Sequence, residues 1–172
     1  MAARLDAGDI VLQQPVPISP QDTAGSLSER LAVEGAGLLV RTVSLIEAGS
    51  APRVPQDESK ATLAPPIRPE EGLIVWSRPA GEICNLVRAL NPAPGAFTHR
   101  DGQRIKVWQA HIIEHRAEGK PGQVVEMARD GVTVATGSGA VVITQVQPES
   151  RRIMDAGAYA RGYRLTAAEI LG

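Results

Sequence analysis

Short apolar stretches separated by turn signals fill residues 96–146, and they constrain the fold more than any other feature of the chain. Apolar and polar residues alternate within these stretches, which is typical of strands that bury one face. Asp-Gly and Ser-Gly pairs between them are hairpin signals. The expected strands cover residues 96–99, 104–112, 122–127, 131–135 and 140–146. Five short strands with glycine at the corners predict a small β-barrel of the OB type.

Helical patterns flank the predicted barrel. Residues 79–90 place Ile83, Val87 and Leu90 on one helical face, with Ser77 as the expected N-cap and Pro79 in the first turn. The Pro-rich turn at residues 91–95 then stops the helix. A last helical stretch is expected at residues 155–163.

The first 48 residues have too few elements for a core of their own. Residues 10–18 resemble an edge strand, and apolar residues recur at helical spacing between an N-cap at Asp22 or Thr23 and a stop at Gly49. A strand and a helix each need a partner layer. We therefore expect residues 1–48 to be a truncated remnant of a larger α/β domain, with the apolar helix face exposed.

The predicted fold class is α+β, with three regions. Residues 1–48 are the remnant, and residues 49–78, rich in Pro, Ser and charge, are a linker. Residues 79–172 are the barrel domain with its flanking helices. Residues 1–78 hold seven Lys or Arg against ten Asp or Glu, whereas residues 79–172 hold eleven against nine. The second part is the better candidate for binding a polyanion.

Other residue patterns exclude several classes of site. Cys84 is the only cysteine, so no intrachain disulfide forms, and its place on an apolar helix face predicts a buried thiol. His111 and His115 are four residues apart, but at a strand end and a loop, so no metal site is expected. No apolar run is long enough to span a bilayer, and we expect a cytoplasmic protein.

An ordered set of short motifs resembles methionyl-tRNA formyltransferases along nearly the whole chain. The motifs are Leu5-Asp6-Ala7-Gly8-Asp9-Ile10, Asp22-Thr23-Ala24-Gly25-Ser26-Leu27, Gln56-Asp57-Glu58, Trp76-Ser77, Arg88-Ala89-Leu90-Asn91-Pro92-Ala93-Pro94-Gly95-Ala96, Lys106-Val107-Trp108 and Arg161-Gly162-Tyr163-Arg164-Leu165. The resemblance implies formyl transfer from 10-formyltetrahydrofolate to the amino group of methionine on initiator tRNA. It also implies a monomeric full-length enzyme.

The same resemblance assigns a catalytic role to Asp6, which would orient a histidine and help to move protons. The family's catalytic Asn and His lie upstream of this Asp, and nothing precedes Met1 in this sequence. We therefore expect no formyl transfer and no bound folate for this polypeptide alone, which would be a fragment, a mis-started reading or a decayed copy.

Basic residues of the barrel and linker are the candidate tRNA-binding residues. They are Lys60, Arg68, Arg88, Arg100, Arg104, Lys106, Arg151 and Arg152. Arg104 and Lys106 alternate with apolar residues and share one strand face, which is either a solvated face or a phosphate-binding strip. Arg88 is alternatively a helix-end charge. Trp108 is expected in the core, with a base-stacking platform as the alternative, and the Gly137-Ser138-Gly139 run is expected to be a hairpin turn.

The chain also departs from the family in ways that weaken the expected tRNA contacts. The departures are at Leu63, Pro66, Pro69, Val75 and Ala93, where the family tends to carry Tyr, Lys, Lys, Asp and Trp. Two alternatives stay open: a non-catalytic OB-type RNA-binding module, and a related formyltransferase that acts on a nucleotide sugar.

Overall fold

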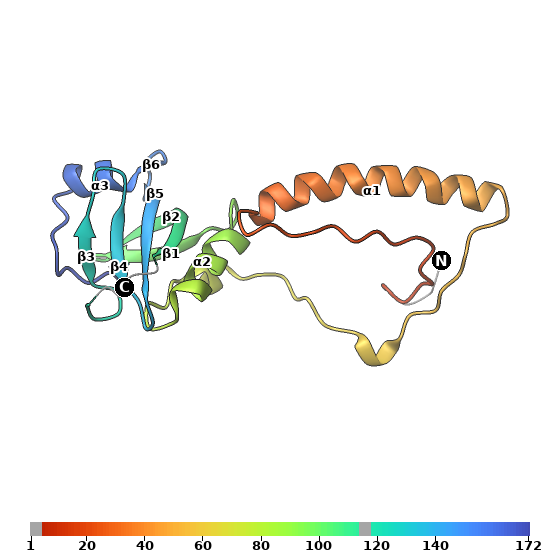
Figure 1. Ribbon diagram of the computed structural model, residues 1–172, viewed down its shortest axis with the longest axis horizontal. Coiled ribbons are helices and arrows are strands. Elements are labelled where there is room, and N and C mark those ends of the chain that lie inside the picture. The colour runs from red at the N-terminus through yellow and green to blue at the C-terminus, as the bar shows by residue number, and fades with distance from the viewer. Residues whose placement is uncertain (1–4, 114–117) are drawn as a thin grey trace. The chain divides into compact units, whose positions relative to one another are not determined.

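A computed structural model describes residues 5–113 and 118–172 of the chain and divides it into two compact units, Met1–Pro66 and Ile67–Gly172 (Figure 1). The elements are α1 (Ala24–Glu47), η1 (Glu58–Lys60), η2 (Pro69–Gly72), α2 (Ala80–Ala89), β1 (Ala96–Arg100), β2 (Gln103–Ile113), β3 (Val124–Met127), β4 (Val132–Ala135), β5 (Ala140–Pro148), β6 (Met154–Asp155) and α3 (Ala156–Gly162). In the described ranges, no helix has the length and apolar character needed to cross a membrane.

The first unit is built around α1, whose predicted ends are confirmed. Thr23 is the N-cap: its side chain accepts a hydrogen bond from the amide of Ser26, and the Ser26 hydroxyl accepts one from the amide of Thr23. Gly49, with a φ of 66°, follows the C-cap at Ala48. Asp22, the other predicted cap, forms an ion pair of 2.7 Å with Arg30.

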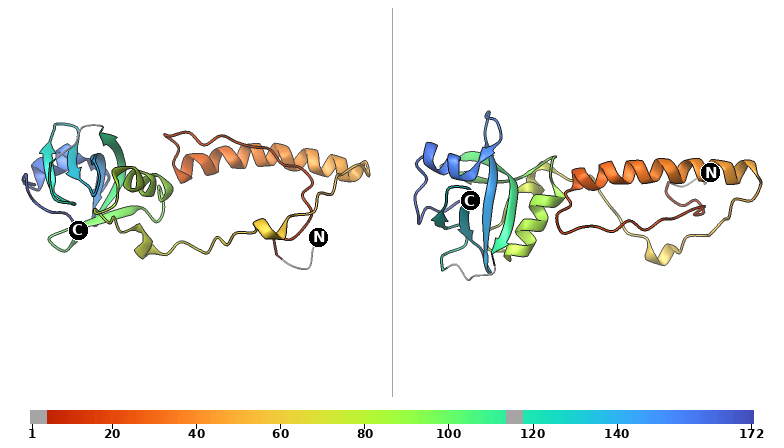
Figure 2. Two further views of the ribbon diagram at one scale, coloured as in Figure 1. Left: turned by 60° about the horizontal axis from the view of Figure 1, so that its bottom comes forward. Right: turned by 45° about the horizontal axis from the view of Figure 1, so that its top comes forward.

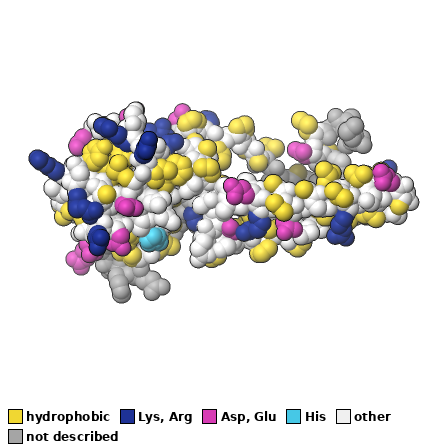
Figure 3. Space-filling view, turned by 90° about the horizontal axis from the view of Figure 1, so that it is seen from above, with side chains coloured by type: hydrophobic (Ala, Val, Ile, Leu, Met, Phe, Trp, Pro, Cys, Tyr) yellow, Lys and Arg dark blue, Asp and Glu magenta, His cyan; other side chains and the backbone are white. Residues whose placement is uncertain are grey.

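The apolar residues of α1 are largely exposed. No residue of the helix is buried, and Val33, Leu39 and Val40 are more than 60% exposed. Figure 3 shows hydrophobic side chains along this unit. The strand prediction for residues 10–18 is wrong beyond Ile10, which pairs with Val54 as an isolated bridge. No neighbouring strand in the described part of the chain offers the remaining residues a hydrogen-bonding partner.

The second unit is a six-stranded antiparallel sheet, and the predicted strands appear in it as β1 to β5. The strand order is β1-β2-β5-β4-β3, and the short β6, which was not predicted, pairs with β5. Figure 2 shows the sheet from two further directions. Turns at Asp101-Gly102, Asp130-Gly131 and Ser138-Gly139 connect the hairpins, as expected. Among the described residues no ladder joins β1 to β3, so strand pairing alone does not close the predicted barrel.

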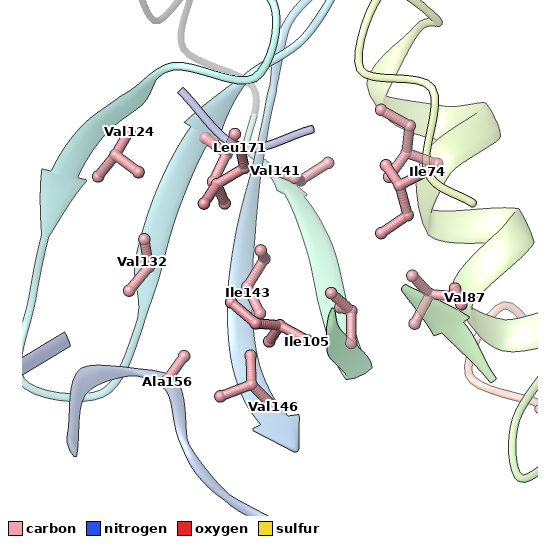
Figure 4. Packing of buried hydrophobic residues seen from close by; sticks show 14 of the residues in the cluster. Ile74, Val87, Ile105, Val124, Val132, Val141, Ile143, Val146, Ala156 and Leu171 are labelled. Carbon is pink, nitrogen blue, oxygen red and sulfur yellow. The ribbon is translucent and has the colours of Figure 1, made fainter. Parts of the chain in front are cut away.

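One hydrophobic core holds this unit together. Figure 4 shows Val132, Ile143 and Val146 of the sheet with Ile105 and Leu171. On the other side, α2 adds Ile83, Val87 and the buried Cys84. The segment before α2 belongs to this core too, because Ile74 and Trp76 are 3% and 5% exposed and the indole N–H of Trp76 donates to the Thr98 hydroxyl at 3.0 Å. Residues 67–78 are therefore part of the second unit.

The start of α2 differs from the prediction. Pro79, not Ser77, holds the N-cap position, and the amide of Ala80 donates to the carbonyl of Ser138 at 3.0 Å. A tertiary contact with the β4–β5 turn thus replaces the expected side-chain cap. Gly137 makes this contact possible, since a Cβ there would overlap the carbonyl of Ser77. The Gly137-Ser138-Gly139 run is a hairpin turn, as predicted.

Candidate nucleic-acid interface

The outward face of β2 carries the most regular array of cations in the second unit. Ile105 and Val107 are 4% and 3% exposed and point into the core, so Arg104 and Lys106 alternate onto the opposite face. Both are half-buried. Within the described residues, no ion pair joins either side chain to a carboxylate. Their positive charge is available to an external anion.

Arg104 is held in place by an aromatic ring. Its guanidinium carbon lies 3.6 Å from the centroid of the Phe97 ring, which is a cation–π contact. His99 packs edge-on against the same ring, with centroids 5.5 Å apart. The Arg104 Nε is buried and has no hydrogen-bond partner in the described part of the chain. The guanidinium is therefore oriented by packing and keeps hydrogen-bonding capacity.

Trp108 lies on this same face, and its predicted place in the core is wrong. The β2–β5 register shifts between Val107 and Gln109, which leaves Trp108 without a paired residue. Its side chain is half-buried and lies outside the core cluster. The indole N–H donates to the Gln147 side-chain oxygen at 3.0 Å, and Gln147 itself pairs with Lys106 across the two strands.

The turn between β5 and β6 brings two further cations beside this array. The Gln147 side-chain nitrogen donates to the carbonyl of Arg151 at 2.8 Å, and the Arg151 amide donates to the carbonyl of Pro148 at 3.0 Å. Arg151 and Arg152 are both exposed. We call Arg104, Lys106, Trp108, Gln147, Arg151 and Arg152 the basic face. The sequence did not point to Gln147 and favoured the core over a base-stacking position for Trp108, although the two-residue spacing from Lys106 places Trp108 on this face.

Arg100, a candidate from the sequence, is engaged inside the unit instead. Its guanidinium donates to both carboxylate oxygens of Glu169, at 2.8 and 3.3 Å, and to the carbonyl of Tyr163 at 3.0 Å. Burial by itself would lower the pKa of Arg100, but hydrogen bonds to Tyr159 and Glu169 raise it above its ordinary value. We assign Arg100 to holding the C-terminal segment and leave it out of the basic face.

The other basic candidates lie elsewhere. Arg88 is in the last turn of α2, where it donates to the Asn85 side chain at 2.7 Å and favours the helix dipole. Arg68 precedes η2 and lies 3.9 Å from Glu71. Lys60, in the first unit, lies 3.4 Å from Asp57 and is 82% exposed. Within the second unit, these contacts of Arg88 and Arg68 lie outside the basic face.

A hollow beside α2 has the opposite charge. Its volume is about 590 Å³, and Leu73, Val75 and Leu86 contribute an apolar surface. Three carboxylates line it, Glu70, Glu71 and Glu82, against one cation, Arg78, which pairs with Glu82 at 3.3 Å. A phosphate backbone would be repelled here. Of the two surfaces, only the basic face suits a nucleic acid.

In the first unit, hydrogen bonds from Gln56 hold the loop that carries Asp6. The Gln56 side-chain nitrogen donates to the carbonyls of Asp6 and Gly8 at 2.8 and 2.7 Å. Asp6 is exposed and has a φ of 54°. The adjoining hollow of about 510 Å³ has Asp9 and Arg53 in its wall. Two of the sequence motifs thus form one local structure, and its catalytic role stays a prediction.

Cys84 is buried in the core of the second unit, as its helical face predicted. Burial raises the pKa of the Cys84 thiol, against the opposing effect of Arg88. His111 is exposed, and His115 lies outside the described residues. Among the residues that the structure describes, no three His, Cys, Asp or Glu side chains form a metal-binding group.

Comparison with known proteins gives a consistent result. The sequence pattern of the formyl transferase C-terminal domain matches residues 66–164. The chain is 51% identical over its whole length to a methionyl-tRNA formyltransferase of Moorella thermoacetica, of which it covers 55%. It is 43% identical to that of Syntrophus aciditrophicus, with 98% of this chain and 54% of that protein covered. HypX from Aquifex aeolicus, solved in complex with tetrahydrofolic acid, shares the fold with a TM-score of 0.73 at 20% identity, over 98% of this chain and 30% of that one.

The chain therefore belongs to the formyl transferases, and residues 66–164 are their C-terminal domain. Within that family it corresponds to the C-terminal portion of methionyl-tRNA formyltransferases. It spans about half the length of the curated relatives that it matches, 55% of the first and 54% of the second. The resemblance seen in the sequence motifs is confirmed.

Proposed function

We propose that the second unit binds the backbone of initiator methionyl-tRNA through the basic face. The observation that carries this proposal is the alignment of Arg104 and Lys106 on one strand face, with Arg151 and Arg152 beside them. Cations that release counterions from phosphates supply much of the affinity for RNA. Phe97 holds the guanidinium of Arg104 in place, which reduces the entropy lost on binding.

We also propose that this unit is an OB-type barrel whose gap the C-terminal segment fills. The amide of Val124 donates to the carbonyl of Glu169, and the amide of Leu171 to that of Gly122. The amide of Gly172 donates to the carbonyl of His99 on β1 at 2.9 Å. The last residues thus bond to both edges of the sheet. OB surfaces commonly bind RNA, which supports the assignment of the basic face.

The whole enzyme, in this proposal, is cytoplasmic and monomeric and transfers a formyl group from 10-formyltetrahydrofolate to methionyl-tRNA. The names of its relatives support this substrate over a nucleotide sugar. Asp6 would be the acid–base residue of the reaction. The family's Asn and His precede this Asp, so a polypeptide limited to residues 1–172 would lack them. Such a polypeptide would bind tRNA without formylating it.

The test of tRNA binding is fluorescence anisotropy of labelled initiator tRNA with the 172-residue chain across a salt series. We expect affinity to fall steeply with salt. Lys106→Gln should weaken binding and lower the slope of log affinity against log salt by about one. Lys120→Gln is the matched control, because Lys120 is exposed in the loop before β3 and outside the basic face. Equal effects of both substitutions would contradict the assignment, and no binding at low salt would refute the function.

Formylation is tested separately, with 10-formyltetrahydrofolate and charged initiator tRNA. The 172-residue chain should give no turnover above background. A longer polypeptide that supplies the upstream Asn and His should restore activity, and Asp6→Asn should abolish it again. Turnover by the 172-residue chain alone would overturn this part of the proposal.

A further inference from the structure

The basic face carries an aromatic ring, which is not needed to neutralise the charge of RNA phosphates. Trp108 is one of two tryptophans in the chain, and the other, Trp76, is buried in the core. Trp108 lies on the side of the sheet that holds Lys106 and Gln147, because it follows Lys106 by two positions on β2 and is hydrogen-bonded to Gln147. An apolar ring on a strand face that otherwise carries cations and amides calls for a ligand with an apolar surface.

Hydrogen bonds fix the edge of this ring. Its N–H donates to Gln147 at 3.0 Å, and Gln147 donates in turn to the carbonyl of Arg151 at 2.8 Å. The backbone carbonyl of Trp108 also accepts a bond from the Asn91 side chain at 2.9 Å. Because the only polar atom of the indole is already paired, what the side chain offers to a ligand is its π surface. The ring is also oriented before any ligand arrives.

Cations lie near the ring. Lys106 precedes Trp108 by two positions on β2, and Arg151 is in the turn after β5, where its carbonyl accepts the bond from Gln147. An aromatic platform beside cations is the arrangement by which proteins bind single-stranded nucleic acid, with bases stacked on the rings and phosphates near the charges. In an A-form duplex the base faces are already stacked on one another, so a duplex has no free base for the ring.

We propose that Trp108 stacks on an unpaired nucleobase, so that the basic face binds single-stranded RNA in preference to duplex RNA. This inference rests on the proposed RNA-binding function and adds the class of RNA segment that it takes. In a tRNA the segment would be an unpaired end or loop. Trp108 sets this preference, whereas Arg104 and Lys106 bind both kinds of RNA.

The test compares a short single-stranded RNA with a hairpin duplex of the same sequence, using the full 172-residue chain and its variants. Trp108→Ala should weaken binding of the single strand by about tenfold and change duplex binding by less than about twofold. Trp108→Phe, which keeps a ring, should recover most of the loss. Stacking of a base should also quench the fluorescence of Trp108. The Trp108→Phe variant, which keeps only Trp76, should not show this quenching.

Lys106→Gln is the comparison that separates the two proposals, because it should weaken both RNAs alike. Salt-dependent binding of both RNAs that Trp108→Ala leaves unchanged would refute the stacking role and leave the basic face standing. An equal loss of both RNAs in Trp108→Ala would also refute it. If neither RNA binds the unsubstituted chain, the proposed function fails as well. Circular dichroism of each variant checks that the fold is kept.

Discussion

At the scale of single residues, similar side chains have different roles because their surroundings differ. Arg100 and Arg104 are four positions apart on neighbouring strands of one hairpin. Arg100 is 14% exposed and bonded to Glu169, whereas Arg104 rests on Phe97 with no paired carboxylate among the described residues. From their charge alone, both arginines are equally good candidates for binding tRNA. The carboxylate of Glu169, 69 positions further along the chain, makes the difference.

This contrast predicts the cost of breaking the Arg100–Glu169 pair. Glu169→Gln should destabilise the second unit by about 1–3 kcal/mol, because it leaves a half-buried guanidinium without its charged partner. Glu82→Gln removes an exposed pair with Arg78 and should cost no more than about 0.5 kcal/mol. Urea unfolding followed by Trp76 fluorescence measures both. Equal midpoints for the two variants would contradict the role given to Arg100.

A second prediction concerns pH and Asp22 in the first unit. Hydrogen bonds, first from Arg30 and then from the amide of Ser19, lower the pKa of Asp22 from 3.8 to about 2. Because the folded-state pKa lies below the unfolded value, the stabilisation is complete above that unfolded value and is lost as pH falls through about 2. Carbon-13 NMR of the carboxyl should show this low midpoint, and Arg30→Gln should raise it. A midpoint near 3.8 in the unsubstituted chain would refute the pairing.

At the scale of elements, the two helices with repeated apolar residues are buried to different extents. Both α1 and α2 repeat apolar residues at helical spacing, yet α1 buries none of its residues and α2 buries four. The capping residues at Thr23 and the stop at Gly49 are local signals, which explains why the ends of α1 were predictable from the sequence. The packing partner of a helix is not a local property.

Leucine truncation tests this difference. Leu90→Ala, at a site 4% exposed, should cost about 2–5 kcal/mol by opening a cavity in the core. Leu39→Ala, at a site 63% exposed on α1, should change stability by less than about 0.5 kcal/mol. Chemical denaturation of both variants is the measurement. A large loss for Leu39→Ala would mean that α1 packs against another surface in solution.

Much of the sheet could be predicted because its signals are also local. Turn glycines and alternating side chains placed β1 to β5 to within a few residues, and put Arg104 and Lys106 on one face. The two-residue β6 and the N-cap of α2 at Pro79 were missed, and Trp108 was wrongly expected in the core. The first two depend on distant partners, β5 and the carbonyl of Ser138, whereas the spacing from Lys106 along β2 already pointed to the outward position of Trp108.

At the scale of the whole molecule, sequence and structure together assign different roles to different surfaces of the chain. Residues 66–164 are a formyl transferase C-terminal domain, and within the second unit the basic face and the hollow by α2 carry opposite net charges. The basic face has Arg104 and Lys106, and the hollow by α2 has Glu70, Glu71 and Glu82. Because of this separation, we expect tRNA to bind the basic face and not the hollow by α2.

The most direct test of this claim is lysine footprinting, because the chain has only three lysines, at positions 60, 106 and 120. The 172-residue chain is acetylated with and without saturating initiator tRNA, and each site is quantified by mass spectrometry. We predict that tRNA protects Lys106 and leaves the acetylation of Lys120 unchanged. Acetylation of Lys106 at an unchanged rate while tRNA is bound would contradict the account.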